Sequence, residues 1–259
     1  MMQENIKIAL VQANQVWENK QANYDNYNHL IETVEADLFL FPEMFHTGFS
    51  MNATHLAEDW SNSEGLNYLK EVAQRKNAAC YTSLIISENG KFHNRAVFVE
   101  PNGTVVHYDK RKTFGLAGED KTYTPGTEQI IHTYKGWKFL LQICYDLRFP
   151  EIQLNNEVNG APKYDVLLTV ANWPERRNTH WKALLPARAI ENQAYVCATN
   201  RVGTDATDLV YSGDSAVIDA LGNHLVQGSY HETVLITTLS SAQLAETRKK
   251  LPFLKDRNI

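Results

Sequence analysis

Short apolar runs bounded by turn-forming residues are the main pattern along this chain. A run of four to eight apolar residues between such boundaries is typical of a strand buried on both faces. These runs predict strands at residues 6–12, 37–41, 80–86, 139–143, 165–171, 195–200, 214–219, 224–226 and 233–238. Residues 95–100 and 104–108 flank Pro101-Asn102-Gly103, which predicts a hairpin.

Apolar residues at helical spacing lie between several of these strands, and each set predicts an amphipathic helix. The sets are Tyr27, Leu30, Ile31 and Val34; Leu66, Leu69, Val72 and Ala73; and Trp181, Leu184, Leu185 and Ala189. Pro186 should kink or interrupt the third helix. A last helix is expected from near Ser240 to before Pro252.

Helices that alternate with strands and hairpins predict an α/β protein. The expected architecture is a mixed sheet or a pair of stacked sheets with helices outside. No linker or low-complexity segment divides the chain. We therefore expect a single domain over residues 1–259, with a core at about 5–240 and a C-terminal helix and tail at 240–259.

Composition narrows the class of protein. Hydrophobic residues make up 43% of the 259 residues, which is enough for a sizeable core, and the net charge of −5 argues against nucleic-acid and anionic-membrane partners. No apolar run approaches the roughly 20 residues that a membrane helix needs. The polar N-terminus, Met1-Met2-Gln3-Glu4-Asn5, lacks the apolar stretch of a signal peptide. Three cysteines without CxxC spacing favour a reducing cytoplasm.

Cys144 is the candidate nucleophile. The apolar run 139–143 ends on it, polar residues follow, and Pro150 stands where a helix would begin. A side chain on such a strand-to-helix turn is exposed, and a helix N-terminus would favour its thiolate. Cys80 and Cys197 lie within apolar strands and are predicted to be inert.

A cysteine nucleophile also needs a base and a cation. Glu43 follows the 37–41 strand, where partial desolvation would make its carboxylate a usable base. Lys110 follows the 104–108 strand and could stabilise a thiolate and an oxyanion, with a backbone N–H near Tyr145 as a second donor. Chemistry alone does not single these two out among the other charged residues at strand ends.

Three segments carry a family resemblance. They are Phe41-Pro42-Glu43-Met44, Tyr108-Asp109-Lys110-Arg111 and Cys144-Tyr145-Asp146-Leu147-Arg148-Phe149-Pro150-Glu151. In order and spacing they resemble the signature segments of the nitrilase superfamily of carbon-nitrogen hydrolases. The resemblance covers nearly the whole chain and implies a four-layer α-β-β-α sandwich of two mixed sheets. It also implies no metal or organic cofactor, and assembly as a homodimer or larger oligomer.

Within that superfamily the sequence is most similar to bacterial ω-amidases, which act on the ω-amides of 2-oxo acids. The closer match is carried by Gly48-Phe49-Ser50-Met51, Ala171-Asn172-Trp173-Pro174 and the segment from Ala187 to Tyr195.

The resemblance implies roles for individual residues. Glu43 is the expected general base, Lys110 the oxyanion cation and Cys144 the nucleophile, while Glu119 matches a second family glutamate. One departure is Lys112-Thr113, where many relatives have His-Leu; it makes Lys112 a rival of Lys110.

The substrate's own carboxylate needs a cation, for which Arg176, Arg177 or Lys112 are candidates by charge and position. The expected pocket walls are Trp173, Phe45 and Phe114. Arg148 is expected to pair with a local carboxylate, and Arg188 is expected to pair with Glu191.

Three alternatives stay open at this stage. The chain could be a carbon-nitrogen hydrolase acting on a nitrile, an N-carbamoyl amino acid or an aliphatic amide. It could be a non-catalytic partner-binding protein on the same scaffold, or a thiol redox sensor, which would lack a nearby resolving cysteine. No metal-binding histidine spacing, serine-hydrolase elbow, dinucleotide fingerprint or P-loop motif occurs.

Overall fold

The fold was analysed in a computed structural model that describes residues 4–257. Met1, Met2 and Gln3 of the polar N-terminus lie outside the described residues, as do residues 258 and 259. None of the described helices is long and apolar enough to cross a membrane.

Two mixed β-sheets form the centre of the molecule. The seven-stranded sheet has the order β17 (Thr233–Ser240), β1 (Asn5–Gln12), β2 (Leu38–Leu40), β4 (Ala79–Glu88), β5 (Lys91–Val99) and β6 (Val105–Asp109), with β3 (Glu58–Asp59) on β4. The six-stranded sheet has the order β16 (His224–Gln227), β15 (Ala216–Ile218), β12 (Tyr195–Asn200), β11 (Val166–Ala171), β8 (Trp137–Ile143) and β7 (Ile131–Tyr134).

The two sheets share a plan. Three neighbouring strands are parallel in each sheet, β1-β2-β4 in one and β8-β11-β12 in the other, and antiparallel strands flank them. The sequence shows a weak counterpart of this plan, because residues 37–43 and 165–175 both run from an Asp-led apolar strand to a Pro-Glu. Two further pairs, β9 (Glu157–Val158) with β10 (Ala161–Pro162) and β13 (Val202–Thr204) with β14 (Val210–Ser212), lie outside these sheets.

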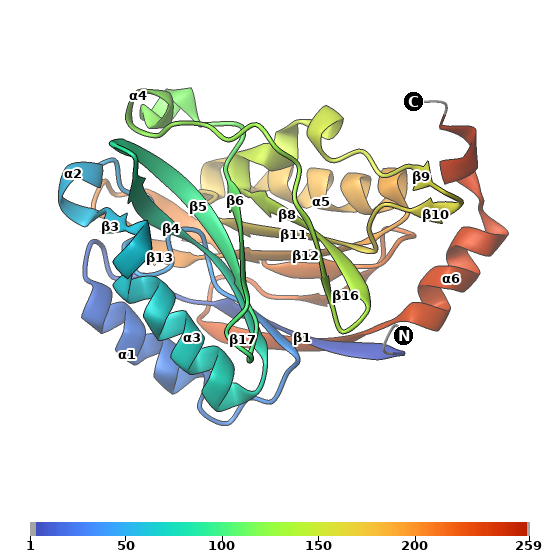
Figure 1. Cartoon of the computed structure of the whole chain (residues 1–259), viewed down its shortest axis with the longest axis horizontal. Helices are drawn as coiled ribbons and strands as arrows, with labels where there is room; N and C mark the ends of the chain where they lie inside the picture. The colour runs from blue at the N-terminus through green and yellow to red at the C-terminus, as the bar shows by residue number, and fades with distance from the viewer. Residues whose placement is uncertain (1–3, 258–259) are drawn as a thin grey trace.

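Helices cover the outer faces of the sheets, which confirms the α-β-β-α sandwich (Figure 1). Helices α1 (Lys20–Ile31) and α3 (Glu64–Lys76) pack on the seven-stranded sheet, and α5 (Asn178–Asn192) packs on the other. The remaining helices are α2 (Ala53–Leu56), α4 (Glu119–Thr122) and α6 (Ser241–Lys250).

Successive side chains along a strand point to opposite faces of its sheet, and this alternation divides the core into two layers. On β1, Ile8 and Leu10 face the second sheet, whereas Ala9 and Val11 face α1 and α3. Because both faces of these strands are buried, their sequences are nearly all apolar. The two sheets also touch through a hydrogen bond, in which the Tyr81 hydroxyl donates to the carbonyl of Gln142 at 2.9 Å.

Several local predictions were wrong. Helix α5 continues through Pro186, so the expected interruption does not occur. The strand expected at 214–219 is present as β15 but is shorter than predicted. Strands β13 and β14 were missed because each has only three residues and exposed positions. Cys144 begins the first of two 3-10 helices, Cys144–Arg148 and Pro150–Ile152, where an α-helix was expected.

Candidate active site

Glu43 lies three residues beyond β2, in a turn that is held from several sides. The N–H of Met44, which has φ +45°, donates to the Ser83 hydroxyl at 2.9 Å. The side-chain amides of Gln15 and Asn172 donate to the Glu43 carbonyl at 3.1 and 2.6 Å. The carboxylate is fully buried, and these bonds fix the backbone from which it projects.

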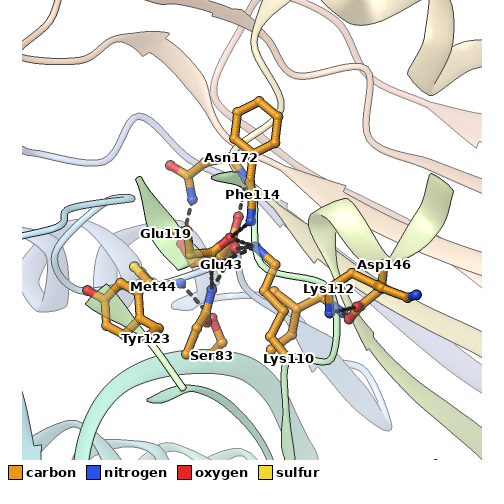
Figure 2. Close-up of polar contacts among 12 residues, drawn as sticks. Glu43, Met44, Ser83, Lys110, Lys112, Phe114, Glu119, Tyr123, Asp146 and Asn172 are labelled. Atoms are coloured by element: carbon orange, nitrogen blue, oxygen red, sulfur yellow. Dashed lines mark hydrogen bonds and ion pairs between the residues drawn. The ribbon is translucent and has the colours of Figure 1, made fainter. Parts of the chain in front are cut away.

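Lys110 follows β6 and directs its ammonium at two carboxylates (Figure 2). Its Nζ lies 2.8 Å from Glu43 Oε1 and 2.9 Å from both carboxylate oxygens of Glu119. Its backbone carbonyl accepts from the N–H of Gly126 at 2.9 Å. A Cβ at Gly126 would lie 2.3 Å from the Asp109 carbonyl oxygen, so only glycine fits this close approach.

Glu119 opens α4 and is fully buried. One of its oxygens also accepts from the N–H of Phe114 at 2.5 Å, which ties the preceding loop to the charged cluster (Figure 2). The structure therefore brings Glu43, Lys110 and Glu119 into direct contact from three separate segments. It also separates Lys110 from its rival, because Lys112 Nζ pairs with Glu151 at 3.2 Å and lies over the Phe149 ring.

Cys144 is the last residue before the chain turns away from β8. Its φ of +43° is in the left-handed region, where a non-glycine side chain is strained, and its side chain is only 9% exposed. It begins a five-residue 3-10 helix, so the expected α-helix N-terminus is not available to stabilise a thiolate.

A buried carboxylate, Asp146, holds this turn beside the lysine-bearing segment. It accepts from the Ile143 N–H at 3.0 Å and from the Tyr108 hydroxyl and the Lys112 N–H at 2.9 Å each. Ile143 precedes the cysteine, whereas Tyr108 and Lys112 flank Lys110. Burial raises the pKa of Asp146 to about 6 despite the opposing Lys110 charge and hydrogen bonds. Asp146 thus crosslinks the two segments that carry Cys144 and Lys110.

The charge distribution favours a neutral thiol and a charged lysine. Burial raises the pKa of Cys144 well above its usual value; the Glu43 charge and a hydrogen bond to that carboxylate raise it further, against the charge of Lys110. Burial alone would lower the pKa of Lys110, but the carboxylates of Glu119 and Glu43 outweigh it and raise that pKa. The Glu43 carboxylate thus acts directly on the cysteine and is the candidate acceptor of its proton.

A cavity of about 440 Å³ opens above Cys144 and Lys110. Aromatic side chains form part of its walls, among them Phe114 and Trp173, which were expected there, and Tyr145. Residues that were not predicted complete it, among them Trp17, Phe49, Met51, Leu209 and Tyr211.

Three arginines line the same cavity: Arg148, Arg176 and Arg177. Arg148 lies 4.4 Å over the Trp173 ring and contacts a ring nitrogen of His180 at 3.2 Å, while Arg177 lies 5.1 Å over the Phe114 ring. Within residues 4–257, none of the three forms an ion pair with a carboxylate. Burial and the neighbouring Arg176 charge lower the pKa of Arg177. Such a cluster of mutually repelling cations favours an anionic ligand.

Two predicted pocket residues are corrected. Phe45 is fully buried in the layer between the first sheet and its helices, where its ring stacks on His46. The turn at Met44 directs it there, and Phe49 lines the cavity instead, with its ring 5.2 Å from Lys110 Nζ. Lys112 does not line the cavity, since its ammonium is paired with Glu151.

Arg148 also differs from expectation, because it faces the cavity and has no carboxylate partner in the described part of the chain. The predicted Arg188–Glu191 pair is confirmed at 2.9 Å, and Cys80 and Cys197 are buried. No cluster of three or more metal-binding side chains occurs among residues 4–257.

Sequence reasoning missed the polar residues that hold the charged cluster. Asn94, on β5, donates to both Glu43 and Glu119, and the backbone N–H of Asn172 donates to Glu43 Oε2 at 2.9 Å. Asn172 stood within a segment that was already singled out. Asn94 had no signal, because a single polar residue in a strand does not reveal which face it occupies.

Sequence comparisons agree with this geometry. The profile of the carbon-nitrogen hydrolase family matches residues 7–249. Omega-amidase YafV of Escherichia coli (strain K12) is 40% identical over 253 residues, which is 97% of this chain and 96% of the relative. The 2-oxoglutaramate amidase of Bacillus subtilis is 32% identical and covers 87% of this chain and 86% of its own length.

Solved structures agree as well. XC1258 from Xanthomonas campestris, a CN-hydrolase superfamily protein with an arsenic adduct in its active site, matches with a TM-score of 0.97 at 39% identity, over 99% of this chain and 98% of that one. Nit3 of Saccharomyces cerevisiae, at 22% identity and a TM-score of 0.85 over 100% and 98% of the two chains, shows the same fold. Because the family profile and these relatives span almost the whole sequence, the chain belongs to the carbon-nitrogen hydrolase family and is an amidase.

Proposed function

We propose that this amidase hydrolyses the ω-amide of a small 2-oxo dicarboxylic acid monoamide, such as 2-oxoglutaramate or 2-oxosuccinamate. The observation that carries the proposal is a set of three arginines, none of them paired with a carboxylate in the described part of the chain, on a cavity that Cys144 and Lys110 also line. Such a substrate has a carboxylate at one end and an amide at the other, so one end could meet the arginines while the other reaches the sulfur. The names of the two amidase relatives support the same substrate class.

The proposed reaction has two halves. Glu43 accepts the thiol proton as Cys144 Sγ attacks the amide carbon, and the charge of Lys110 and the N–H of Tyr145 stabilise the oxyanion. The carbon–nitrogen bond then breaks, ammonia leaves with the proton returned by Glu43, and a thioester remains. Water, deprotonated by Glu43, attacks the thioester; the sulfur leaves and recovers its proton.

Lys110 would act in this scheme mainly through its charge. Three carboxylate oxygens already lie within 2.9 Å of its Nζ, so a direct hydrogen bond to the oxyanion requires one of those contacts to open. Glu119 keeps the ammonium in place and keeps it charged.

We also propose self-association as a homodimer or larger oligomer. The C-terminal half of the exposed side of α5 carries the apolar residues Ala183, Ala187 and Ile190. Of these, Ile190 is 51% exposed, and Leu221 in the adjacent turn is 50% exposed. A cytoplasmic location is proposed on the ground that Cys80, Cys144 and Cys197 are all free thiols.

A substrate panel tests the proposed activity. We expect 2-oxoglutaramate to give a much higher kcat/KM for ammonia release than glutamine, a nitrile or an N-carbamoyl amino acid. Glutamine is the matched control, since only its α-substituent differs. Cys144→Ala should lose more than about 10⁴-fold in kcat, because the nucleophile is gone. Preference for one of the three other substrates would contradict the proposed substrate class. An active Cys144→Ala would contradict the proposed cysteine nucleophile.

Alkylation of Cys144 tests how the thiol is activated. If Glu43 accepts the proton during attack, Glu43→Gln should slow alkylation by iodoacetamide at pH 7 by about 10²-fold or more. A preformed thiolate predicts the opposite sign, because removal of a neighbouring negative charge lowers the thiol pKa and speeds alkylation. Mass spectrometry of the labelled peptide over time distinguishes the two outcomes.

Neutralising the arginines tests carboxylate recognition. Arg148→Gln and Arg177→Gln should each lower kcat/KM for 2-oxoglutaramate about 10- to 100-fold, as expected for loss of a charged hydrogen bond. Turnover of a neutral aliphatic amide should change little. Lys112→Gln is the control, since that cation is already paired outside the cavity. Equal losses on both kinds of substrate would count against a carboxylate site.

Sedimentation analysis tests self-association. We expect a dimer or larger species for the native chain and a monomer for Ile190→Glu, because a buried unpaired charge opposes contact across the α5 face. Val16→Glu, at a similarly exposed valine beside α1, should leave the oligomer intact. A monomeric native chain, or an oligomer unaffected by Ile190→Glu, contradicts the proposal.

A further inference from the structure

Asn94 contacts every member of the buried charged cluster. Its side-chain nitrogen donates to Glu43 Oε1 at 2.8 Å and to Glu119 Oε1 at 3.0 Å, and its backbone carbonyl accepts from the N–H of Lys110 at 3.0 Å. The side chain is 1% exposed and does not line the cavity. It can therefore affect the reaction only through its charged neighbours.

Two carboxylates share a single ammonium in this cluster, so it carries one net negative charge when all three groups are ionised. Both Oε1 atoms lie within 2.9 Å of Lys110 Nζ (Figure 2), so two like charges lie close together on buried side chains. Repulsion between them would turn the two side chains apart or bind a proton between them. The amide of Asn94 is a second donor to the same two oxygens, and it adds no charge.

The hydrogen bonds also determine which part of Glu43 stays available. A carboxylate oxygen accepts about two hydrogen bonds. Lys110 and Asn94 occupy both positions on Oε1, and the backbone N–H of Asn172 occupies one on Oε2. One acceptor position on Oε2 remains for the proton of the Cys144 thiol.

We propose that Asn94 is a positioning residue for amide hydrolysis, which holds the carboxylates of Glu43 and Glu119 together on Lys110 and keeps one oxygen of Glu43 free to accept the thiol proton. The inference rests on the proposed role of Glu43 as the base. Asn94 does not touch the substrate, so its loss should lower kcat and leave KM nearly unchanged.

The protonation of the cluster gives the sharpest test. The titratable groups of the cluster are Glu43 from the turn after β2, Lys110 from the end of β6 and Glu119 from α4. Cys144 and Asp146 from the turn after β8 and Tyr123 from the end of α4 interact with them. Tyr123 stays neutral, since burial and the two carboxylates raise its pKa. Lys110 stays charged, so only the carboxylates and the thiol can respond to a change at residue 94.

Asn94→Asp keeps the shape of the side chain but replaces the donor with a third carboxylate. At pH 7.5 we expect kcat to fall about 10²- to 10³-fold, similar to the loss of one donor in other hydrolase sites. At lower pH the cluster takes up one proton, which restores both its charge and a donor at residue 94. Activity should therefore recover, and the basic limb of the kcat profile should move to lower pH.

Asn94→Ala removes the donor and adds no charge. Its kcat should fall about 10-fold or more, and the acid limb should move to higher pH because the carboxylates then hold protons more tightly. No new basic limb should appear. Asn102→Asp is the control: it makes the same chemical change in an exposed turn, where the side chain acts as an acceptor, and it should behave like the native enzyme.

Thermal unfolding of each variant separates positioning from folding. Parallel losses of kcat at all pH values, with an unchanged profile, would mean that Asn94 is only structural and would overturn the inference. If Asn94→Asp fails to fold, the test rests on Asn94→Ala alone: an acid limb that does not move to higher pH would overturn the inference. Glu43→Gln separates the role of Glu43 from that of Asn94. An active Glu43→Gln would show that Glu43 is not the base. An inactive Glu43→Gln together with native-like Asn94 variants would show only that Asn94 is not a positioning residue.

Discussion

The ion cluster of Lys110 between Glu43 and Glu119 constrains three separate segments of this molecule. A buried ammonium is tolerated only when it is paired and fully hydrogen-bonded, and loss of one partner of a buried pair costs about 3–5 kcal/mol. The turn after β2, the end of β6 and the start of α4 must therefore converge. Several otherwise unexplained features follow, including the glycine required at position 126 and the Phe114 N–H bonded to Glu119.

The position of Cys144 depends on its backbone conformation and on hydrogen bonds to neighbouring backbone N–H groups, rather than on an ion pair. Its left-handed φ is a strained conformation, and Asp146 maintains it by bonding the residue before the cysteine to the segment around Lys110. Because the thiol is buried next to a carboxylate, its resting form is neutral. In such a site a base that accepts the proton during attack is more useful than a thiolate formed in advance, since no isolated buried negative charge on sulfur has to be maintained between turnovers.

The sequence was sufficient for the fold class and for bringing Glu43, Lys110 and Cys144 forward as members of one site. Long apolar runs gave the strands, and three motifs in order gave Glu43, Lys110 and Cys144, which the structure brings to one place. The predictions of pocket residues that were wrong depended on local backbone geometry. Phe45 and Phe49 are both aromatic and only four residues apart, and the φ of Met44 sends one to the core, while the other lines the cavity.

Residues that act by donating a hydrogen bond to the charged groups could not be predicted from the sequence, because their partners come from distant parts of the chain. Asn94 is one polar residue in a strand, and nothing in a single sequence indicates that two carboxylates from elsewhere will meet it. Arg148 was expected to pair locally, yet its guanidinium lies over Trp173, which is 25 residues further along the chain and comes from another strand end. Contacts between side chains from different strand ends depend on how the strands are aligned in the sheets. The spacing of apolar residues along the sequence does not give that alignment.

The division of the site between the two sheets has a consequence for folding. The base and the lysine project from segments that follow strands of one sheet, and the sulfur and Asn172 follow strands of the other. An intermediate with only one sheet formed, or with both formed but not docked, would have half of the reacting groups and no cavity. Catalytic turnover should thus report the docked native state alone, and its recovery during refolding should trail the return of secondary structure.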